Sequence, residues 1–418
     1  NFIIFCYLDF ANQILYSIFA DQIRIKNGIL YRTHAYLVEH TNAPVRRDLM
    51  DEIDWNDQLI GIKGTRGVGK TTFLLQYAKE KYGIDRSCLY INMNNFYFQG
   101  HSIAEFAAEF VKRGGKVLLI DQVFKQENWS KELRECHEKF PALKIIFTGS
   151  SVMRLKEENP ELNGLVKSYN LRGFSFREFL NLQTGNQFKP YTLDEILKNH
   201  EQIIKEILPK ARPLNYFQDY LHHGFYPFFL EKRSFSENLL KTMNMMIEVD
   251  ILLIKQIELK YLTKIKKLLY LLAVDGPVAP NVSQLATDIQ TSRATVMNYI
   301  KYLEDARLIN LVYAKGDCFP KKPSKIMMHN TNLMYSIYPV KVDEQDVLDT
   351  FFLNTFWKDH IVNKGEKGST FLVDGNLNFR ICTEGCKFKN NPNIFYALHH
   401  KEVGRENQIP LWLFGFLY

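Results

Sequence analysis

Residues 64–71 read Gly-Thr-Arg-Gly-Val-Gly-Lys-Thr, which fits the pattern G-x-x-x-x-G-K-[ST] in full. The stretch lies between an apolar run, Leu59 to Ile62, and an amphipathic run, Thr72 to Tyr82, so it joins an expected strand to an expected helix. Glycines let successive backbone N–H groups surround phosphates, and the helix N-terminus adds partial positive charge. The sequence therefore predicts a phosphate-binding loop formed by Gly64, Thr65, Arg66, Gly67, Val68, Gly69, Lys70, Thr71 and Thr72.

Three side chains in and after this loop indicate ATP and Mg²⁺ as ligands. Lys70 is expected to reach the β- and γ-phosphate oxygens, and the hydroxyl of Thr71 to bind Mg²⁺. The later apolar run 117–120 ends in Asp121, an arrangement in which the acid completes the Mg²⁺ shell. A glycine-rich structural turn, the alternative, would need neither Lys70 nor Thr71.

The residue after Asp121 bears on hydrolysis. In the additional-strand class of P-loop ATPases a glutamate at this position orients and deprotonates the attacking water. This chain has Gln122, whose amide can hold a water but cannot accept its proton. We therefore expect binding with slow hydrolysis, and Glu127, on the loop beyond the strand, is the alternative acid.

Further candidate residues follow the later strands. Thr148 and Ser150 come at the end of the run 144–147, where a hydroxyl could contact a γ-phosphate, although a turn rich in small residues explains them equally well. An arginine beyond a strand end could reach a phosphate in its own subunit or in a neighbouring subunit. The second case would make the protein a homo-oligomer. The preferred candidate is Arg172, with ordinary surface arginine as the alternative for each of Arg154, Arg172 and Arg177.

Short apolar runs alternate with amphipathic helical stretches, which predicts an α/β fold, a P-loop parallel sheet with helices on both faces, over residues 29–185. Two helix starts in this region carry the capping-box spacing of a serine three residues before a glutamate, Ser102 with Glu105 and Ser175 with Glu178. The expected strands are Leu59–Ile62, Cys88–Asn92, Val117–Asp121, Lys144–Phe147 and Ser168–Leu171.

Four other regions flank this domain. Residues 1–28 are an apolar N-terminal segment, for which a packed helix is favoured over a membrane span because Asp9 interrupts it and a basic start is missing. Periodicity predicts a helical lid or linker over 186–266 and a winged helix-turn-helix over 267–318. Residues 319–418 are expected to form a small α+β C-terminal domain.

The second helix of the helix-turn-helix presents two faces. Apolar residues recur at helical spacing on its core face, namely Val296, Tyr299, Ile300 and Leu303. Another face is polar and could contact the phosphates and bases of duplex DNA through Arg293, Thr295, Asn298 and Lys301. Docking of a protein partner is the equally weighted alternative.

Composition sets broad limits. The 418 residues carry a net charge of +7, which permits contact with nucleic acid without requiring it. Six scattered cysteines indicate a reducing compartment, so we expect a cytoplasmic protein. Cys382 and Cys386 form a C-x₃-C pair without a second pair at ligand spacing, and although His399 and His400 are near, ordinary thiols are favoured over a zinc site.

From about Ile29 to its end, the chain resembles a prokaryotic AAA+-type P-loop ATP-binding family, frequent in Bacteroidetes and their relatives, with a C-terminal domain of unknown function. That C-terminal domain looks restriction-endonuclease-like. The resemblance implies the fold and ATP binding, and its cellular role is poorly defined. The motifs that carry it are Gly61–Gly64, Ile120–Asp121, Asn128–Trp129, Phe147–Ser151, Gly173–Phe179 and Ile409–Gly415.

Two departures from the family pattern limit what the resemblance implies. The family reads Asp-Glu-Val-His where this chain has Asp121 followed by Gln122, Val123 and Phe124. In the C-terminal domain the family has an Asp followed by Phe-Glu-x-Gly-Gly-Lys. Asp374 is present here, but residues 379–384 read Phe-Arg-Ile-Cys-Thr-Glu, so Arg380 replaces a carboxylate. A nuclease needs clustered carboxylates to hold Mg²⁺, so we expect this domain not to cleave DNA.

The leading hypothesis is an ATP·Mg²⁺-dependent switch. One alternative is an active AAA+ ATPase coupled to DNA binding or processing, against which Gln122 and Arg380 argue. Another is a small-molecule P-loop kinase, which would need an acceptor pocket and a catalytic base that the sequence does not indicate.

Overall fold

The computed structural model describes residues 28–153, 155, 159–231, 234–357, 359–366, 368–387 and 391–418. The packed helix expected within residues 1–28 lies outside these ranges except for its last residue. No helix within them is long and apolar enough to cross a membrane.

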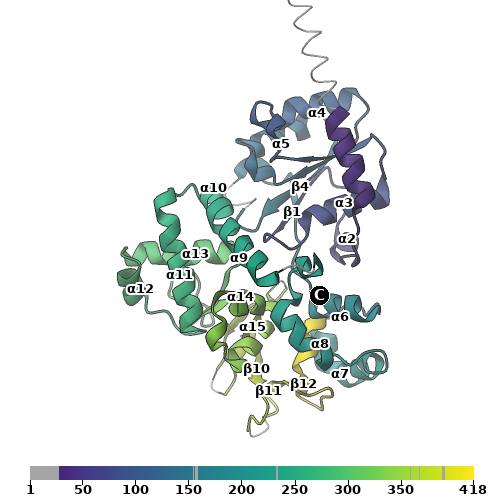
Figure 1. Ribbon diagram of the computed structural model, residues 1–418. Helices are drawn as coiled ribbons and strands as arrows, with labels where there is room; N and C mark the ends of the chain where they lie inside the picture. The colour runs from purple at the N-terminus through teal and green to yellow at the C-terminus, as the bar shows by residue number, and fades with distance from the viewer. Residues whose placement is uncertain are drawn as a thin grey trace, which may run out of the picture.

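Five parallel strands form the sheet of the N-terminal domain, in the order β2-β3-β4-β1-β5 (Figure 1). All five expected strands are confirmed, with β4 extended to Ser150. Because β4 lies between β1 and β3, the carboxyl ends of these three strands meet at one edge, where ligands of open parallel sheets bind. The strands are β1 Leu59–Gly64, β2 Cys88–Asn92, β3 Val117–Asp121, β4 Lys144–Ser150 and β5 Lys167–Asn170.

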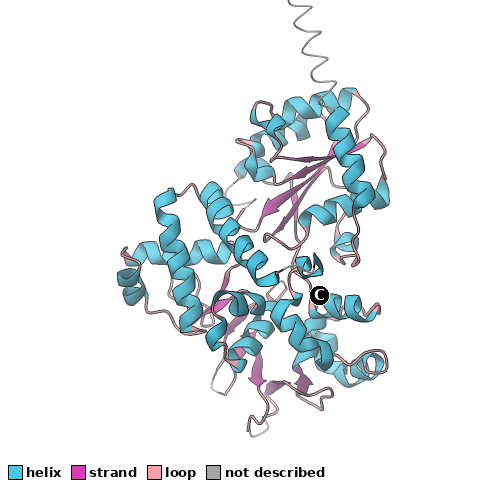
Figure 2. Cartoon of the chain, in the orientation of Figure 1, coloured by secondary structure: helices cyan, strands magenta, loops and turns pink. Residues whose placement is uncertain are grey.

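Helices cover both faces of this sheet, as Figure 2 shows. Alternate residues of β3 face opposite cores: Leu119 packs with α3, and Leu118 with α4 and α5. Both expected capping boxes are present, at the starts of α4 and α6. The helices are residues 28–40, α2 Leu49–Glu52, α3 Lys70–Lys81, η1 Phe96–Gln99, α4 Ile103–Lys112, η2 Val123–Lys125, α5 Trp129–Lys139, η3 Pro160–Leu162 and α6 Phe176–Thr184.

The helical region expected over 186–266 contributes to two different cores. Its first part packs with the C-terminal domain and comprises α7 Leu193–Ile207, α8 Leu214–Asp219 and the π-helical turn η4 Tyr220–Gly224. Its second part joins a core that the P-loop domain and the helix-turn-helix region share. That part comprises η5 Pro227–Glu231, α9 Phe235–Met245, the π-helical turn η6 Met246–Ile251, α10 Leu252–Lys255 and η7 Leu259–Tyr261.

Three helices and an antiparallel strand pair follow, and the second strand lies beyond residue 318, where the winged helix-turn-helix was expected to end. Val296 and Ile300 of α13 are fully buried, so the predicted core face of this helix is confirmed. The elements are α11 Leu262–Asp275, α12 Val282–Asp288, α13 Arg293–Asp305, β6 Ile309–Val312 and β7 Lys325–Met328.

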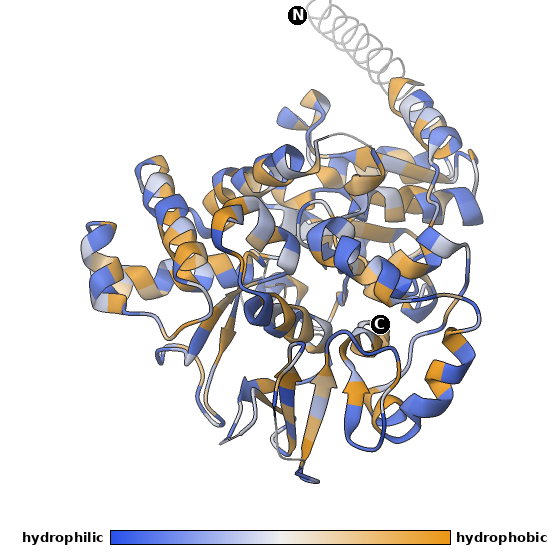
Figure 3. Ribbon diagram, turned by 60° about the horizontal axis from the view of Figure 1, so that its bottom comes forward, coloured by the Kyte–Doolittle hydropathy of each residue, from blue (hydrophilic) through white to orange (hydrophobic). Residues whose placement is uncertain are grey.

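The C-terminal domain is a small mixed sheet with the order β12-β11-β10-β9-β8, packed against helices. Its strands carry many hydrophobic positions, as the colouring of Figure 3 shows. Trp412 of the helical turn η9 is fully buried. The domain's elements are α14 Thr331–Ile337, η8 Pro339–Lys341, α15 Glu344–Phe356, β8 Val362–Lys364, β9 Phe371–Val373, β10 Leu377–Cys382, β11 Ile394–Leu398, β12 Gln408–Pro410 and η9 Leu411–Phe416.

Candidate functional site

The loop after β1 has the backbone that its glycines predict. Gly67 and Gly69 adopt φ values of 86° and 93°, in the left-handed region that glycine tolerates. A Cβ at Gly64 would collide with the carbonyl oxygen of Leu171, so the loop also packs too closely for a side chain there. Helix α3 begins directly after Gly69, at Lys70. The predicted strand, loop and helix are therefore confirmed.

Lys70 reaches back across the loop. Its Nζ donates hydrogen bonds of 2.8 Å to the carbonyl oxygens of Gly64 and Thr65. Burial lowers the pKa of Lys70 to about 8, although the carboxylates of Asp250 and Asp121 partly oppose this shift. Because burial disfavours its charged form, this ammonium gains from an incoming anion.

Asp121 lies at the centre of a set of polar side chains at the end of β3. The Thr71 hydroxyl donates to its carboxylate over 2.7 Å, the Tyr90 hydroxyl over 2.8 Å, and Asn92 Nδ2 over 3.2 Å. Thr148 donates to its other oxygen. Hydroxyl and carboxylate oxygens are ligands that Mg²⁺ prefers, so the pair predicted from the sequence, Thr71 and Asp121, fits this ion.

Gln122 and Thr148 are held next to this acid. Gln122 adopts a left-handed φ of 56°, and its backbone N–H donates to Thr148 Oγ1 over 2.8 Å. Gln122 lines the pocket described below, whereas Glu127 is exposed and does not line it. Thr148 is fully buried, so in this arrangement it positions Asp121 and Gln122.

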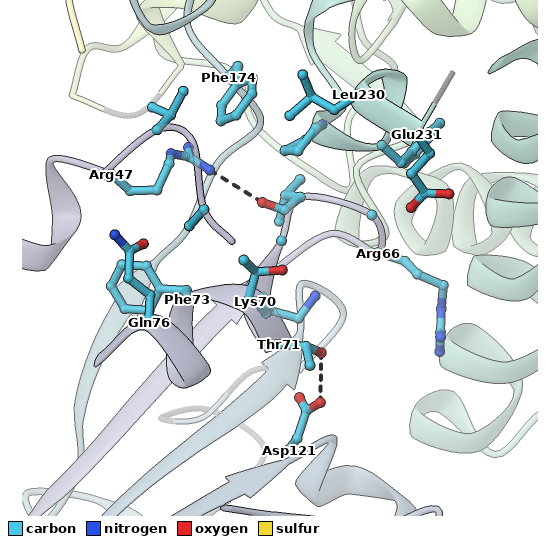
Figure 4. A pocket seen from close by; sticks show the side chains of 18 of the residues that line it. Arg47, Arg66, Lys70, Thr71, Phe73, Gln76, Asp121, Phe174, Leu230 and Glu231 are labelled. Carbon is cyan, nitrogen blue, oxygen red and sulfur yellow. Dashed lines mark hydrogen bonds between the residues drawn. The ribbon is translucent and has the colours of Figure 1, made fainter. Parts of the chain in front are cut away.

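A cavity of about 470 Å³ opens between the P-loop and the helical region (Figure 4). The P-loop side is formed by Arg66–Phe73, together with Asp121 and Gln122 from the end of β3. Opposite them, Pro227–Phe228, Leu230–Glu231 and Asp250 come from the helical region. Lys70 and Thr71 lie side by side in this cavity, which can hold a nucleotide's phosphates.

Asp250 is a pocket residue that sequence reasoning missed. It is 3% exposed and accepts hydrogen bonds from Arg66 Nη2 at 2.5 Å and from Ser150 Oγ at 3.0 Å. Ser150 therefore lies at the pocket, as expected, but its hydroxyl is bonded to a carboxylate. Asp250 belongs to a π-helical turn distant in sequence, and no local motif marks it.

Arg47 is a second residue that no motif indicated. Its guanidinium donates to Glu178 Oε1 at 2.8 Å and to the carbonyl oxygens of Arg172 and Val68 at 2.8 and 3.3 Å. It also lies over the ring of Phe174. Figure 4 shows Arg47 at the edge of the pocket. Through its bonds to Val68 and Arg172, this side chain joins the P-loop to the segment after β5.

The predicted phosphate-contacting arginines lie elsewhere. Arg172 is buried, donates to Asn354 O and lies over the ring of Tyr418 at 3.6 Å, away from the pocket at the P-loop. Its place after a strand end suggested a phosphate contact, but aromatic packing against the C-terminus holds it. Arg177 is bound to Asp48 and Phe188 O, and Arg154 lies outside the described residues.

The residues proposed to contact DNA differ in accessibility. Arg293 and Asn298 are exposed on α13, and Thr295 is half-buried with its hydroxyl bonded to Ser292. Lys301 is bound to Glu304 at 2.5 Å and lies 3.4 Å from Asp305. The polar face therefore offers Arg293 as its exposed cation.

Asp374 and Arg380, the two positions of the C-terminal domain that bear on nuclease activity, do not form one site. Asp374 accepts from His360 Nδ1 at 2.7 Å and from the backbone N–H of Ile361 at 2.9 Å. Arg380 lines a separate cavity that does not include Asp374.

The affinity for ATP should fall as the pH rises above 8. Free Lys70, with a pKa of about 8, loses its proton there, whereas bound phosphates favour the ammonium, so binding takes up a proton. Between pH 7 and pH 9 the dissociation constant should rise about tenfold, because one group must then be reprotonated. Calorimetry at pH 9 in two buffers of different ionisation enthalpy measures the uptake. Zero uptake would contradict this role of Lys70.

Two family matches cover most of the described chain. Residues 56–180 match the family described as AAA domain, and residues 214–341 match a domain of unknown function (DUF8612). A curated relative, uncharacterized protein MJ1637 of Methanocaldococcus jannaschii, is 27% identical over 289 residues. The match covers 65% of this chain and spans 60% of that relative's length.

Solved structures with some likeness include a variant of Thermotoga maritima RuvB and AMPPCP-bound DnaA from Aquifex aeolicus. The first is 14% identical, with a TM-score of 0.28, over 76% of this chain and 95% of that one. The second is 15% identical, with a TM-score of 0.22, over 62% and 86%. The family match and the loop geometry together identify residues 56–180 as an AAA-type P-loop domain.

Proposed function

We propose that this chain is an ATP-dependent switch, in which a nucleotide at the P-loop loosens the contact between the P-loop domain and the helical region. The observation that carries the proposal is the carboxylate of Asp250, which bonds both Arg66 of the P-loop and Ser150 at the end of β4. These donors, with Lys70, are the groups that phosphates would seek. Nucleotide and Asp250 therefore compete for the same partners.

The same loop touches the helix-turn-helix unit. Thr65 Oγ1 donates to the carbonyl oxygen of Ala306, directly after α13, over 3.3 Å. Thr65 also lies 3.5 Å from the sulfur of Met246, in the π-helical turn that carries Asp250. A shift of the P-loop on binding would thus act on two neighbouring elements, which gives the switch a route to α13.

The residues that would bind ATP and Mg²⁺ have distinct tasks. Lys70 and the N-terminus of α3 hold the phosphates, and Thr71 with Asp121 holds the metal. When bound, Mg²⁺ neutralises charge on the β- and γ-phosphates. Gln122 orients water without accepting a proton, so the ATP-bound form is long-lived, as a switch requires.

Duplex DNA is the partner that we propose for α13. Arg293 and Asn298 are exposed near its N-terminal end, where a recognition helix contacts bases and phosphates. Lys301, already bound to Glu304 and Asp305, adds no free charge. A protein partner at the same face is the alternative.

Asp250→Asn should tighten ATP binding about tenfold. Loss of the carboxylate's charge frees Arg66 and Ser150 for phosphates, and one such charge contact is worth about 1.5 kcal/mol or more. The matched control is Glu248→Gln, in the same π-helical turn, whose carboxylate pairs with Lys266 outside the pocket. Fluorescence titration with an ATP analogue compares the three proteins.

Hydrogen exchange separates the switch from simple binding. An ATP analogue should speed exchange of the amides of η6 in the wild-type chain, because competition removes the bonds to Asp250. If Asp250→Asn binds no more tightly and exchange in η6 is unchanged, the contact is structural and the switch proposal fails. If Asp250→Asn binds more weakly, Asp250 belongs to the binding site itself.

A further inference from the structure

Two consecutive histidines and a glutamate meet at one end of the C-terminal sheet. His399 and His400 directly follow β11, and Glu344 is the first residue of α15. Both Nε2 atoms face the same carboxylate oxygen, Glu344 Oε1, at 3.5 Å from His399 and 3.3 Å from His400. None of the three residues lines the pocket at the P-loop.

The backbone here is bent in a way that brings the two imidazoles together. Consecutive side chains of a strand point to opposite faces, but β11 ends at Leu398 and His400 adopts a left-handed φ of 55°. The two rings then lie with their centroids 3.7 Å apart. A non-glycine residue keeps such a conformation only where its surroundings hold it.

His399 lacks the hydrogen bonds that a buried imidazole normally makes. It is 7% exposed, and its Nδ1 has no partner among the described residues. Its Nε2 lies 3.5 Å from the glutamate, too far for a normal hydrogen bond. Because buried polar groups are nearly always satisfied, the unpartnered Nδ1 and the long Nε2 contact together leave this imidazole under-satisfied.

We propose that Glu344, His399 and His400 bind a zinc ion. Ligands bonded to tetrahedral zinc at roughly 2.0–2.1 Å lie about 3.4 Å from each other, close to the observed 3.3 and 3.5 Å. Two imidazole nitrogens and a carboxylate are a donor set that suits zinc. Glu384 Oε2 lies 3.8 Å from His400 Nε2 but outside this group of mutually close ligand atoms, so the fourth position is left to water.

The ion would join two elements that are distant in sequence, the start of α15 and the end of β11. Glu344 and Glu384 are exposed, so the ion can enter from solvent. The partial positive charge at the start of α15 opposes a cation, which weakens the expected affinity. The ion's role would be structural: by binding only the folded form, it raises the free energy of unfolding.

The test is a zinc titration of the full-length, tag-free chain after chelator treatment. Wild-type protein should bind one equivalent of Zn²⁺ and show a raised melting temperature. His399→Ala and His400→Ala should each weaken binding at least about tenfold. The control is His360→Ala, a histidine of the same domain bound to Asp374 outside the cluster, which should bind Zn²⁺ like the wild type.

Glu344→Gln guards against misfolding, because its side chain is 52% exposed and the change keeps its shape. This variant should fold and still lose zinc affinity. When Co²⁺ is added instead of Zn²⁺, the variant should lack the visible absorption of a tetrahedral site. Absence of stoichiometric Zn²⁺ binding by the wild type, or equal binding by all four variants, would overturn the site. These results do not depend on ATP, so they stand apart from the switch proposal.

Discussion

Lys70→Ala is expected to abolish the thermal stabilisation that ATP gives to the wild-type chain. At a hundredfold excess over its dissociation constant, a ligand adds about 2.7 kcal/mol to the free energy of unfolding. For a domain of this size that corresponds to a rise in melting temperature of roughly 5 to 10 °C. Lys70 is the cation that Figure 4 shows beside Thr71 in the pocket, and alanine leaves the phosphates without it.

The control for this experiment lies on the same helix. Lys79 is exposed and donates to the carbonyl oxygens of Glu39 and Thr41, away from the pocket. Lys79→Ala should keep the full ATP-induced shift in differential scanning fluorimetry. A shift that survives in Lys70→Ala would mean that ATP binds elsewhere on the chain.

Local patterns predicted the P-loop domain well. The glycine spacing of 64–71 indicates a left-handed backbone, which depends on only a few neighbouring residues. Gly67 and Gly69 adopt this conformation. Strand runs fully buried between two helical layers are uniformly apolar, as β3 is up to Asp121, so they stand out in the sequence. Sites built from such neighbours can be predicted.

Contacts between segments that are distant in sequence could not be predicted from local patterns. Arg47 meets Glu178, 131 residues away, and Asp250 meets Arg66, 184 residues away. Neither residue belongs to a recurring pattern, because an ion pair needs only a suitable charge on each of two elements. Without the packing of those elements, either residue looks like an ordinary surface charge.

The helical region shows a related limit. Periodicity identified amphipathic helices over 186–266, but it reports only which face of a helix is apolar and not what covers that face. In the structure α7 packs with the C-terminal domain, whereas α9 belongs to the core that the P-loop domain and the helix-turn-helix region share. Arg172 shows the same limit. Its aromatic partner Tyr418 is distant in sequence, so no local pattern indicated that Arg172 packs there and not at the pocket.

Gln122→Glu should raise ATP hydrolysis strongly. Gln122 lines the pocket next to Asp121, but its amide cannot take a proton from water. General-base catalysis typically contributes 10²- to 10⁴-fold, roughly 3 to 5 kcal/mol of barrier, so the wild type should turn over very slowly and the variant at least about a hundredfold faster. Steady-state phosphate release at saturating ATP and Mg²⁺ measures both proteins.

Two other acids decide how a different result would be read. Glu127 is exposed and lies outside the pocket, so Glu127→Gln should leave hydrolysis unchanged and serves as the control. Brisk turnover by the wild type that is lost in Glu127→Gln would show that the loop moves and that this chain is an active ATPase. Brisk turnover lost instead in Asp250→Asn would place the base in the helical region, where the buried carboxylate already faces Arg66 and Ser150. In either case Gln122 would not limit the rate, and the long-lived ATP-bound form that the switch requires would not exist.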